Sequence, residues 1–274
     1  MGGPVCIVDR QSWRGNRLAP GERAIPEETA IAFTYNGTSY AVMMATPQDL
    51  EDFAIGFSVT EGIVGSPDEI ESLQIIDQDL GIELRMRLAE PRASAFHERR
   101  RYLAGPTGCG LCGIESLDEA MRTPALVAGD SRFSPHEIMQ ALHALDGRQT
   151  LNRETHAVHG AAFYLPERGL VALREDVGRH NALDKLAGAL VQESVPCARG
   201  FGLVTSRLSI EMIQKAAAIG IPVLAAVSAP TALAVRTAQA AGMTLIAVAR
   251  SDGFEIFTHP QRIKEERSLH VVAG

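Results

Sequence analysis

Alternating apolar and polar residues predict several strands in the first third of the chain. Strands over residues 30–35 and 40–44 flank Asn36-Gly37, a dipeptide typical of a two-residue hairpin turn. Two further strands are expected over residues 70–76 and 82–88. Residues 1–29 show no such periodicity, so we expect them to form a loose lead-in segment.

A helix is predicted between the second and the third of these strands. Thr46 stands in the position of an N-cap, Pro47 falls in the first turn, and Glu61-Gly62 marks the end. The apolar residues recur on one side and indicate a stripe facing a core: Leu50, Phe53, Ala54 and Phe57. Residues 30–104 are therefore predicted to fold as a small α+β unit.

Residues 105–274 have the pattern of an α/β domain. A capping box at Ser134–Glu137 starts a helix that ends at Gly147, and two strands follow over residues 156–165 and 169–174. The pattern then alternates between strand and helix, over residues 201–205, 209–219, 222–227, 231–241 and 244–249. This order predicts parallel strands with right-handed crossovers, within a sheet flanked by helices.

Composition and charge narrow the function classes. Hydrophobic residues make up 46% of the 274 residues and charged residues 22%, as in an ordinary globular protein. The net charge of −7 argues against a general nucleic-acid binder. Residues 1–9 have no apolar core of a signal peptide, and the most apolar run, residues 219–227, is too short to span a membrane. Free thiols suit a reducing compartment, so a cytoplasmic location is expected.

The most unusual stretch is Gly105–Glu115, where four glycines surround Cys109 and Cys112. A short helix is predicted to follow it, and helix N-terminal N–H groups lower the pKa of a nearby thiol. Four cysteines in the whole chain do not make a disulfide framework. Sulfur chemistry by this pair is therefore the favoured interpretation. A structural zinc site remains an alternative, with His156 and His159 as the other two ligands.

A second dense cluster, Arg174–Lys185, lies where a strand passes into a helix. Strand ends are where α/β folds build sites, although a salt-bridged surface turn is the simpler alternative. Two later helix starts, Ser206–Ser209 and Ser228–Thr231, offer N–H groups and hydroxyls to a phosphate, or simple N-capping. We therefore predict an anion-binding site formed by Arg179, His180, Lys185, Arg207, Ser228 and Thr231.

These motifs, taken in order, resemble the formate dehydrogenase accessory sulfurtransferase family, called FdhD. The resemblance covers about residues 30–260 and is carried by six stretches: Thr46–Gly62, Gly108–Gly113, Val158–Ala162, Asp176–Lys185, Ser228–Thr231 and Gly253–His259. Gly160 departs from the alanine expected after the motif histidine.

The resemblance implies a fold related to cytidine deaminases and a cytoplasmic homodimer. It implies that the protein accepts persulfide sulfur from a cysteine desulfurase. The sulfur then passes to the bis-guanine-dinucleotide form of the molybdenum cofactor, before that cofactor enters formate dehydrogenase. Deaminase chemistry itself is not expected, because the sequence contains no His-x-Glu.

The resemblance also assigns residues. It makes Cys109 the sulfur carrier, while Cys112 either keeps the site reduced or relays sulfur. It assigns cofactor contact to Phe254, Glu255, Ile256, Phe257, Thr258 and His259. A guanine nucleotide such as GDP is then expected to bind at the ends of the parallel strands. His159 is either a proton shuttle or a core residue. A cofactor-binding chaperone without sulfur chemistry remains the alternative function.

Overall fold

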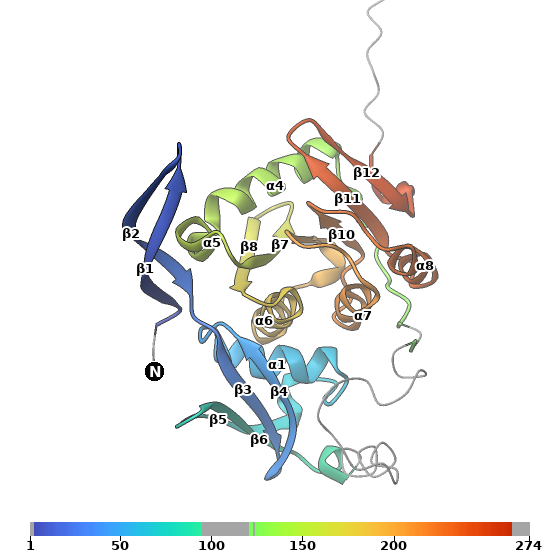
Figure 1. The fold of residues 1–274 in the computed structure, drawn as a ribbon. Coiled ribbons are helices and arrows are strands. Elements are labelled where there is room, and N and C mark those ends of the chain that lie inside the picture. Colours follow the sequence, from blue (N-terminus) through green and yellow to red (C-terminus); the bar gives the residue numbers. More distant parts are fainter. Residues whose placement is uncertain (1–2, 95–120, 123, 265–274) are drawn as a thin grey trace, which may run out of the picture.

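A computed structural model describes residues 3–94, 121–122 and 124–264 of the chain. Figure 1 shows a layered α/β arrangement: two sheets lie on opposite sides of a layer of helices. Cys109, Cys112 and the helix predicted after them lie outside the described residues. None of the described helices is long and apolar enough to cross a membrane.

The larger sheet has six strands in the order β12-β11-β10-β9-β7-β8. These strands are β7 (His159–Leu165), β8 (Gly169–Asp176), β9 (Phe201–Val204), β10 (Val223–Ala226), β11 (Thr244–Arg250) and β12 (Gly253–Thr258). β9, β10 and β11 run parallel, as predicted, and the other three strands pair antiparallel. The predicted mixed sheet is therefore confirmed.

Helices cover both faces of this sheet (Figure 1). One face packs against α6 (Arg179–Gln192), α7 (Ile210–Ala218) and α8 (Ala232–Ala240). The other face packs against α4 (Pro135–Arg148), which starts with the predicted capping box at Ser134. A short helix that the sequence did not predict, α5 (Thr150–Thr155), follows α4.

The small unit is a four-stranded sheet in the order β4-β3-β6-β5. Its strands are β3 (Thr29–Tyr35), β4 (Thr38–Ala45), β5 (Ile70–Gln78) and β6 (Gly81–Leu88). Asn36 and Gly37 both have positive φ, as the predicted hairpin turn requires. The helix α1 (Leu50–Thr60) packs on one face of this sheet with the predicted stripe, and also lies against α6 and α7.

The predicted N-cap of α1 is wrong. Asp49, not Thr46, precedes the helix, and it makes no side-chain cap hydrogen bond. Thr46 is buried and serves the large domain instead: its N–H donates to Asp176 and its hydroxyl accepts from the N–H of Val177 at 3.1 Å. The contact of Thr46 with Asp176 and Val177 therefore takes the place of the N-cap hydrogen bond that the sequence predicted.

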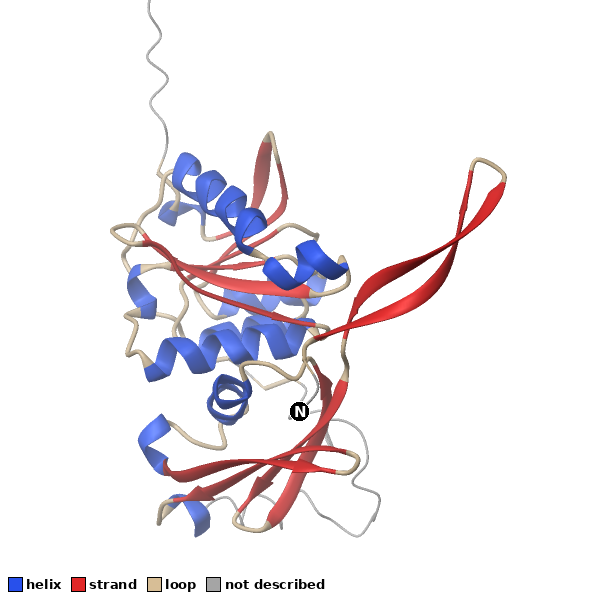
Figure 2. Ribbon diagram, turned by 90° about the vertical axis from the view of Figure 1, so that its left-hand side faces the viewer, coloured by secondary structure: helices blue, strands red, loops and turns tan. Residues whose placement is uncertain are grey.

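The expectation of a loose lead-in is also wrong. β1 (Val5–Arg14) and β2 (Arg17–Pro26) pair along their whole length as an antiparallel ribbon. Gly15 and Asn16 form its turn with positive φ. Figure 2 shows this ribbon projecting from the body of the molecule. Its strands lack regular alternation because both faces of most of the ribbon are exposed.

Two glycines set the distance between α1 and α6. A Cβ on Gly56 would lie 1.7 Å from the carbonyl oxygen of Asp184, and one on Gly188 would lie 1.9 Å from that of Asp52. The two helix backbones therefore touch at a crossing that only glycine permits. This crossing joins the small unit to the large domain.

Candidate functional site

Two loops meet at the edge of the large sheet where its parallel strands end. Arg207 follows β9, Ser228 follows β10, and Thr231 is the N-cap of α8. The N–H of Leu208 donates to the carbonyl of Ala229 at 3.4 Å, and the N–H of Thr231 donates to that of Leu208 at 2.9 Å. The structure thus brings these three predicted residues onto neighbouring loops. Arg207 and Thr231 are exposed there.

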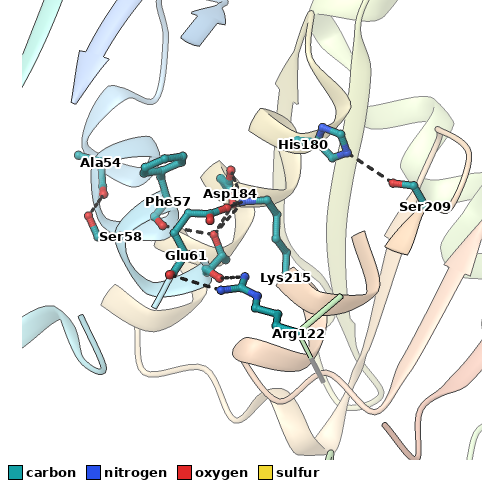
Figure 3. Close-up of polar contacts among 10 residues, drawn as sticks. Ala54, Phe57, Ser58, Glu61, Arg122, His180, Asp184, Ser209 and Lys215 are labelled. Atoms are coloured by element: carbon teal, nitrogen blue, oxygen red, sulfur yellow. Dashed lines mark hydrogen bonds and ion pairs between the residues drawn. The ribbon is translucent and has the colours of Figure 1, made fainter. Parts of the chain in front are cut away.

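The start of α6 lies beside the start of α7. His180 Nε2 is 3.5 Å from the hydroxyl of Ser209 (Figure 3). Glu211, in the first turn of α7, interacts with Ser209, His180 and Arg179. Neither helix has a side-chain cap hydrogen bond at its N-cap. First-turn N–H groups favour an anion, and at the start of α7 the Glu211 carboxylate already supplies one, whereas α6 has no acidic residue in its first turn.

Arg179 adds a donor to the same region. Its Nε atom is enclosed and has no hydrogen-bond partner among the described residues. Burial and the charge of Arg179, together with Lys215, lower the pKa of His180 to about 4. Burial and Arg179 also lower the pKa of His159. Both imidazoles are therefore neutral at pH 7, the form that accepts a proton, and the role of His159 as a proton shuttle stays a prediction.

Lys185 is enclosed rather than available to a ligand. It is 0% exposed, its ammonium lies 2.7 Å from Asp176, and it donates to the carbonyl of Thr46 at 2.8 Å. Asp176 also accepts from Asn181 and from the N–H of Gly178. The groups of this network satisfy one another, so Lys185 holds α6 against the end of β4. A structural role fits it better than the predicted phosphate contact.

A pocket of about 170 Å³ lies between α1, α6 and α7. Lys215 lines it, and Figure 3 shows the Lys215 side chain beside Asp184 and Glu61. The Lys215 ammonium is 2.9 Å from Asp184 and 2.6 Å from Glu61. Burial opposes the charge, but the two carboxylates outweigh it and raise the pKa of Lys215. His180 and Glu211 also line this pocket, which therefore adjoins the starts of α6 and α7.

Arg122 connects this pocket to the chain that carries the cysteines. It donates to the carbonyl of Thr60 at 3.0 Å, and its own carbonyl accepts from Gln214 at 3.0 Å. Arg122 lines the pocket and stands ten residues after Cys112 in the sequence. The described chain thus resumes after the cysteine stretch at the wall of this pocket.

The predicted cofactor segment, residues 254–259, is not gathered at one place. It forms the edge strand β12, which runs antiparallel to β11, so only its start lies at the edge that carries Arg207. Glu255, Ile256 and Phe257 are exposed along the strand. Thr258 is buried, and its hydroxyl donates to the carbonyl of Met243 at 2.7 Å. His259 lies at the opposite edge, with Nε2 3.0 Å from the carbonyl of Gln239.

The zinc alternative stays untested. No group of three or more potential metal ligands occurs among the described residues, but both cysteines of the proposed set lie outside them. His159 starts β7 and is half-buried, whereas His156 is exposed at the end of α5.

Comparison with known proteins decides the family. A model of the FdhD/NarQ family matches residues 26–264. The chain belongs to this family. It is 54% identical to the sulfur carrier protein FdhD of Agrobacterium fabrum over 257 residues, covering 93% of this chain and 95% of the relative. It is 53% identical to the sulfur carrier protein FdhD of Brucella abortus over 259 residues, covering 94% of this chain and 96% of that relative.

A solved structure supports both the family and the fold. It is described as a formate dehydrogenase accessory protein from Desulfotalea psychrophila, and it superposes with a TM-score of 0.73 at 25% sequence identity. The match covers 95% of this chain and 99% of that one. The family resemblance inferred from the motifs is therefore confirmed.

The sequence analysis missed the pocket residues of this family member, chiefly Glu61, Asp184 and Lys215. Asp184 belongs to a motif we singled out, but nothing in the motif separates its role from that of Lys185. Lys215 had a local signal. It follows Met212 and Ile213 and precedes three alanines, so it is a charge within an apolar helix. Such a lysine is rarely buried without an acidic partner.

The departure at Gly160 has a local explanation. A Cβ at this position would lie 2.5 Å from Nε2 of Gln149, which is itself buried. Alanine at 160 would therefore require the Gln149 amide to move away from β7.

Proposed function

We propose that this chain is a sulfur carrier that serves formate dehydrogenase. The observation that carries the proposal is the Cys109–Cys112 pair in a chain 54% identical to a protein named sulfur carrier protein FdhD. The related solved structure, described as a formate dehydrogenase accessory protein, supports the recipient. The chemistry belongs in a reducing cytoplasm, where thiols persist.

In the first step, the thiolate of Cys109 attacks the outer sulfur of a persulfide on a cysteine desulfurase. A new sulfur–sulfur bond forms on Cys109 as the donor's bond breaks, and the donor cysteine leaves as a thiolate. The exchange needs no external oxidant. Exposed helix N–H groups or a nearby cation would favour the attacking thiolate.

Delivery of the sulfur as sulfide requires two electrons. Cys112 can supply them by attacking the Cys109 sulfur, which releases the outer sulfur to molybdenum and closes a Cys109–Cys112 disulfide. A dithiol reductant then restores both thiols. This assignment gives Cys112 a role distinct from that of Cys109.

The recipient is the bis-guanine-dinucleotide form of the molybdenum cofactor, bound as substrate. Arg179, His180, Arg207, Ser228 and Thr231 support this part of the proposal because they converge on one edge. Arginine guanidinium groups and helix N–H groups are strong ligands for phosphate. A long ligand could continue along β12, whose six residues extend about 20 Å.

Intact mass measurement tests the proposal. After incubation with a cysteine desulfurase and cysteine, the wild-type chain should gain about 32 Da, the mass of one persulfide sulfur. Cys109→Ala should gain nothing and should fail to mature formate dehydrogenase, while Cys6→Ser should behave as wild type. Full maturation activity in Cys109→Ala would refute sulfur transfer and leave a cofactor-binding chaperone as the function.

A further inference from the structure

The β1–β2 ribbon separates its charges between its two faces. Directly paired residues share a face, and neighbours along a strand point to opposite faces. Asp9 pairs with Glu22, so the two acids lie on one face of the ribbon, together with Trp13. All four of its arginines lie on the other, which we call the arginine face: Arg10, Arg14, Arg17 and Arg23.

The arginine face is not neutralised by the chain itself. All four guanidinium groups belong to exposed residues. Arg10 and Arg23 donate only to backbone carbonyls, those of Glu22 and Thr155, each at 3.3 Å. No carboxylate of the described residues forms an ion pair with any of the four. Their charges are therefore available to an anion from outside.

The tip of the ribbon places two of these charges directly opposite each other. Arg14 pairs with Arg17 across the turn that Gly15 and Asn16 form with positive φ. Like charges at directly paired positions destabilise a strand pair, and a two-stranded ribbon is only marginally stable. A carboxylate between the two guanidinium groups would remove this repulsion, and arginine binds carboxylates with two parallel hydrogen bonds. The tip is therefore suited to an acidic group.

A second cationic position lies further along the same face. Arg10 is four residues from Arg14, about 13 Å along the strand. Small side chains separate the two positions, because Ser12 pairs with Ala19 and the residue opposite Arg10 is Gly21. A chain segment can lie across these small residues. Carboxylates four residues apart in an extended segment have the same spacing of about 13 Å.

The charge of the ribbon is opposite to that of the whole chain. Its four arginines and two acids give it a charge of +2, whereas the chain has a net charge of −7. Figure 2 shows the ribbon extending away from both sheets. A cationic arm on an anionic body directs an acidic partner to the arm, since the rest of the surface repels it.

We propose that the arginine face is a docking surface for an acidic segment of another protein. Carboxylates of that segment bind between Arg14 and Arg17 at the tip and reach Arg10 further along. A nucleic acid fits this face less well, because the chain is acidic and Trp13 lies on the opposite face, where it cannot stack on a base bound by the arginines. The proposal depends neither on the sulfur chemistry nor on what covers the Trp13 face.

Fluorescence anisotropy of labelled decaglutamate, titrated with the full chain at low salt, tests the proposal. Arg14→Ser combined with Arg17→Ser removes the two charges of the tip, and Arg14→Lys combined with Arg17→Lys keeps them. Arg87→Ser is the matched control, because Arg87 has a side chain that is 75% exposed on β6 but is neutralised by Glu71 at 2.9 Å. Circular dichroism of each variant checks that it is folded.

The wild type and Arg87→Ser should bind decaglutamate equally. The double serine variant should bind it roughly 10-fold more weakly, the effect of losing two exposed charge contacts, and should show a smaller dependence on salt. The double lysine variant should lose less than the double serine variant. Absence of binding by the wild type, equal binding by the double serine variant, or tighter binding of an oligodeoxynucleotide of the same length would overturn the proposal. None of these outcomes affects the persulfide measurement on Cys109.

Discussion

Two ion pairs, each with one member on α6, differ in how completely the protein encloses them. Lys185 and Asp176 are both 0% exposed, and backbone groups of Thr46, just after β4, and of the β8–α6 loop complete their hydrogen bonds. Lys215 and Asp184 are also buried, but their third member, Glu61, is 28% exposed and the group lines a pocket. Adjacent residues of one helix, Asp184 and Lys185, thus point into different environments. Both sets carry charge, but only Lys185–Asp176 is fully enclosed. The group around Lys215 lines a pocket, so a ligand can reach it.

Lys185→Met should have the largest effect on stability. It leaves the Asp176 carboxylate buried without its cation, which costs about 3–5 kcal/mol of unfolding free energy. Urea denaturation followed by circular dichroism measures this loss. Lys185→Met combined with Asp176→Asn is the control and should recover part of it. If Lys185→Met lost less unfolding free energy than Lys215→Met, the two ion pairs would not differ in the way described.

Lys215→Met should cost less, about 2–3 kcal/mol. Removing the cation leaves two carboxylates together, but water in the pocket and the partial exposure of Glu61 reduce the penalty. The same urea titration measures it. Lys215→Arg is the matched control, because it keeps the charge. If Lys215→Met were neutral in stability, the second ion pair would not hold α1 and α7 together.

Arg207→Ala tests whether a nucleotide binds at the sheet edge that carries Arg207. GDP should bind the wild type and bind this variant about 1.5–3 kcal/mol more weakly, the usual range for a hydrogen bond to a charged group. Added salt should weaken wild-type binding further. Calorimetry measures both effects. Arg199→Ala is the matched control, because Arg199 precedes β9 at the opposite edge of the sheet and pairs with Glu167, and it should bind GDP normally. Equal binding by Arg207→Ala would place the nucleotide elsewhere.

The smallest effect concerns pH. The unfolded imidazole titrates near 6.5, whereas burial, Arg179 and Lys215 lower the pKa of His180 to about 4 in the folded chain. The unfolded state therefore binds the proton first as the pH falls, and stability is lost between about pH 6.5 and 4. His180→Gln should unfold like the wild type at pH 7 and be about 1–2 kcal/mol more stable than it at pH 5, after allowance for partial exposure. Identical pH profiles would contradict the lowered pKa.

Local signals predicted the elements whose cause is local. The Asn36-Gly37 turn, the capping box at Ser134 and the alternation of strands and helices after residue 200 all appear in the structure. Each depends on residues only a few positions apart, so the sequence contains the whole cause.

Long-range contacts explain where the structure departs from local chemistry. Thr46 has the chemistry of an N-cap, but Asp176 and Val177, about 130 residues away, use its groups. Lys185 has the chemistry of a phosphate ligand, but Asp176 neutralises it inside the protein. Periodicity could not find the β1–β2 ribbon, because periodicity reports one buried face and most of this ribbon has none. The sequence predicted which residues carry chemistry better than which of them a ligand can reach.

The glycine crossing of α1 and α6 has a consequence for folding. α1 buries one side on its own sheet and presents Gly56 to the backbone of α6 on the other. A fragment of residues 30–94 alone would expose the Gly56 side of α1 to water. A fragment of residues 124–264 alone would expose the surface of α6 at Gly188, against which α1 packs. Neither fragment is then an autonomous folding unit, whatever boundary the sequence suggests. Heat should melt the two parts in one cooperative transition, and a larger residue at either glycine should lower its midpoint for both parts together.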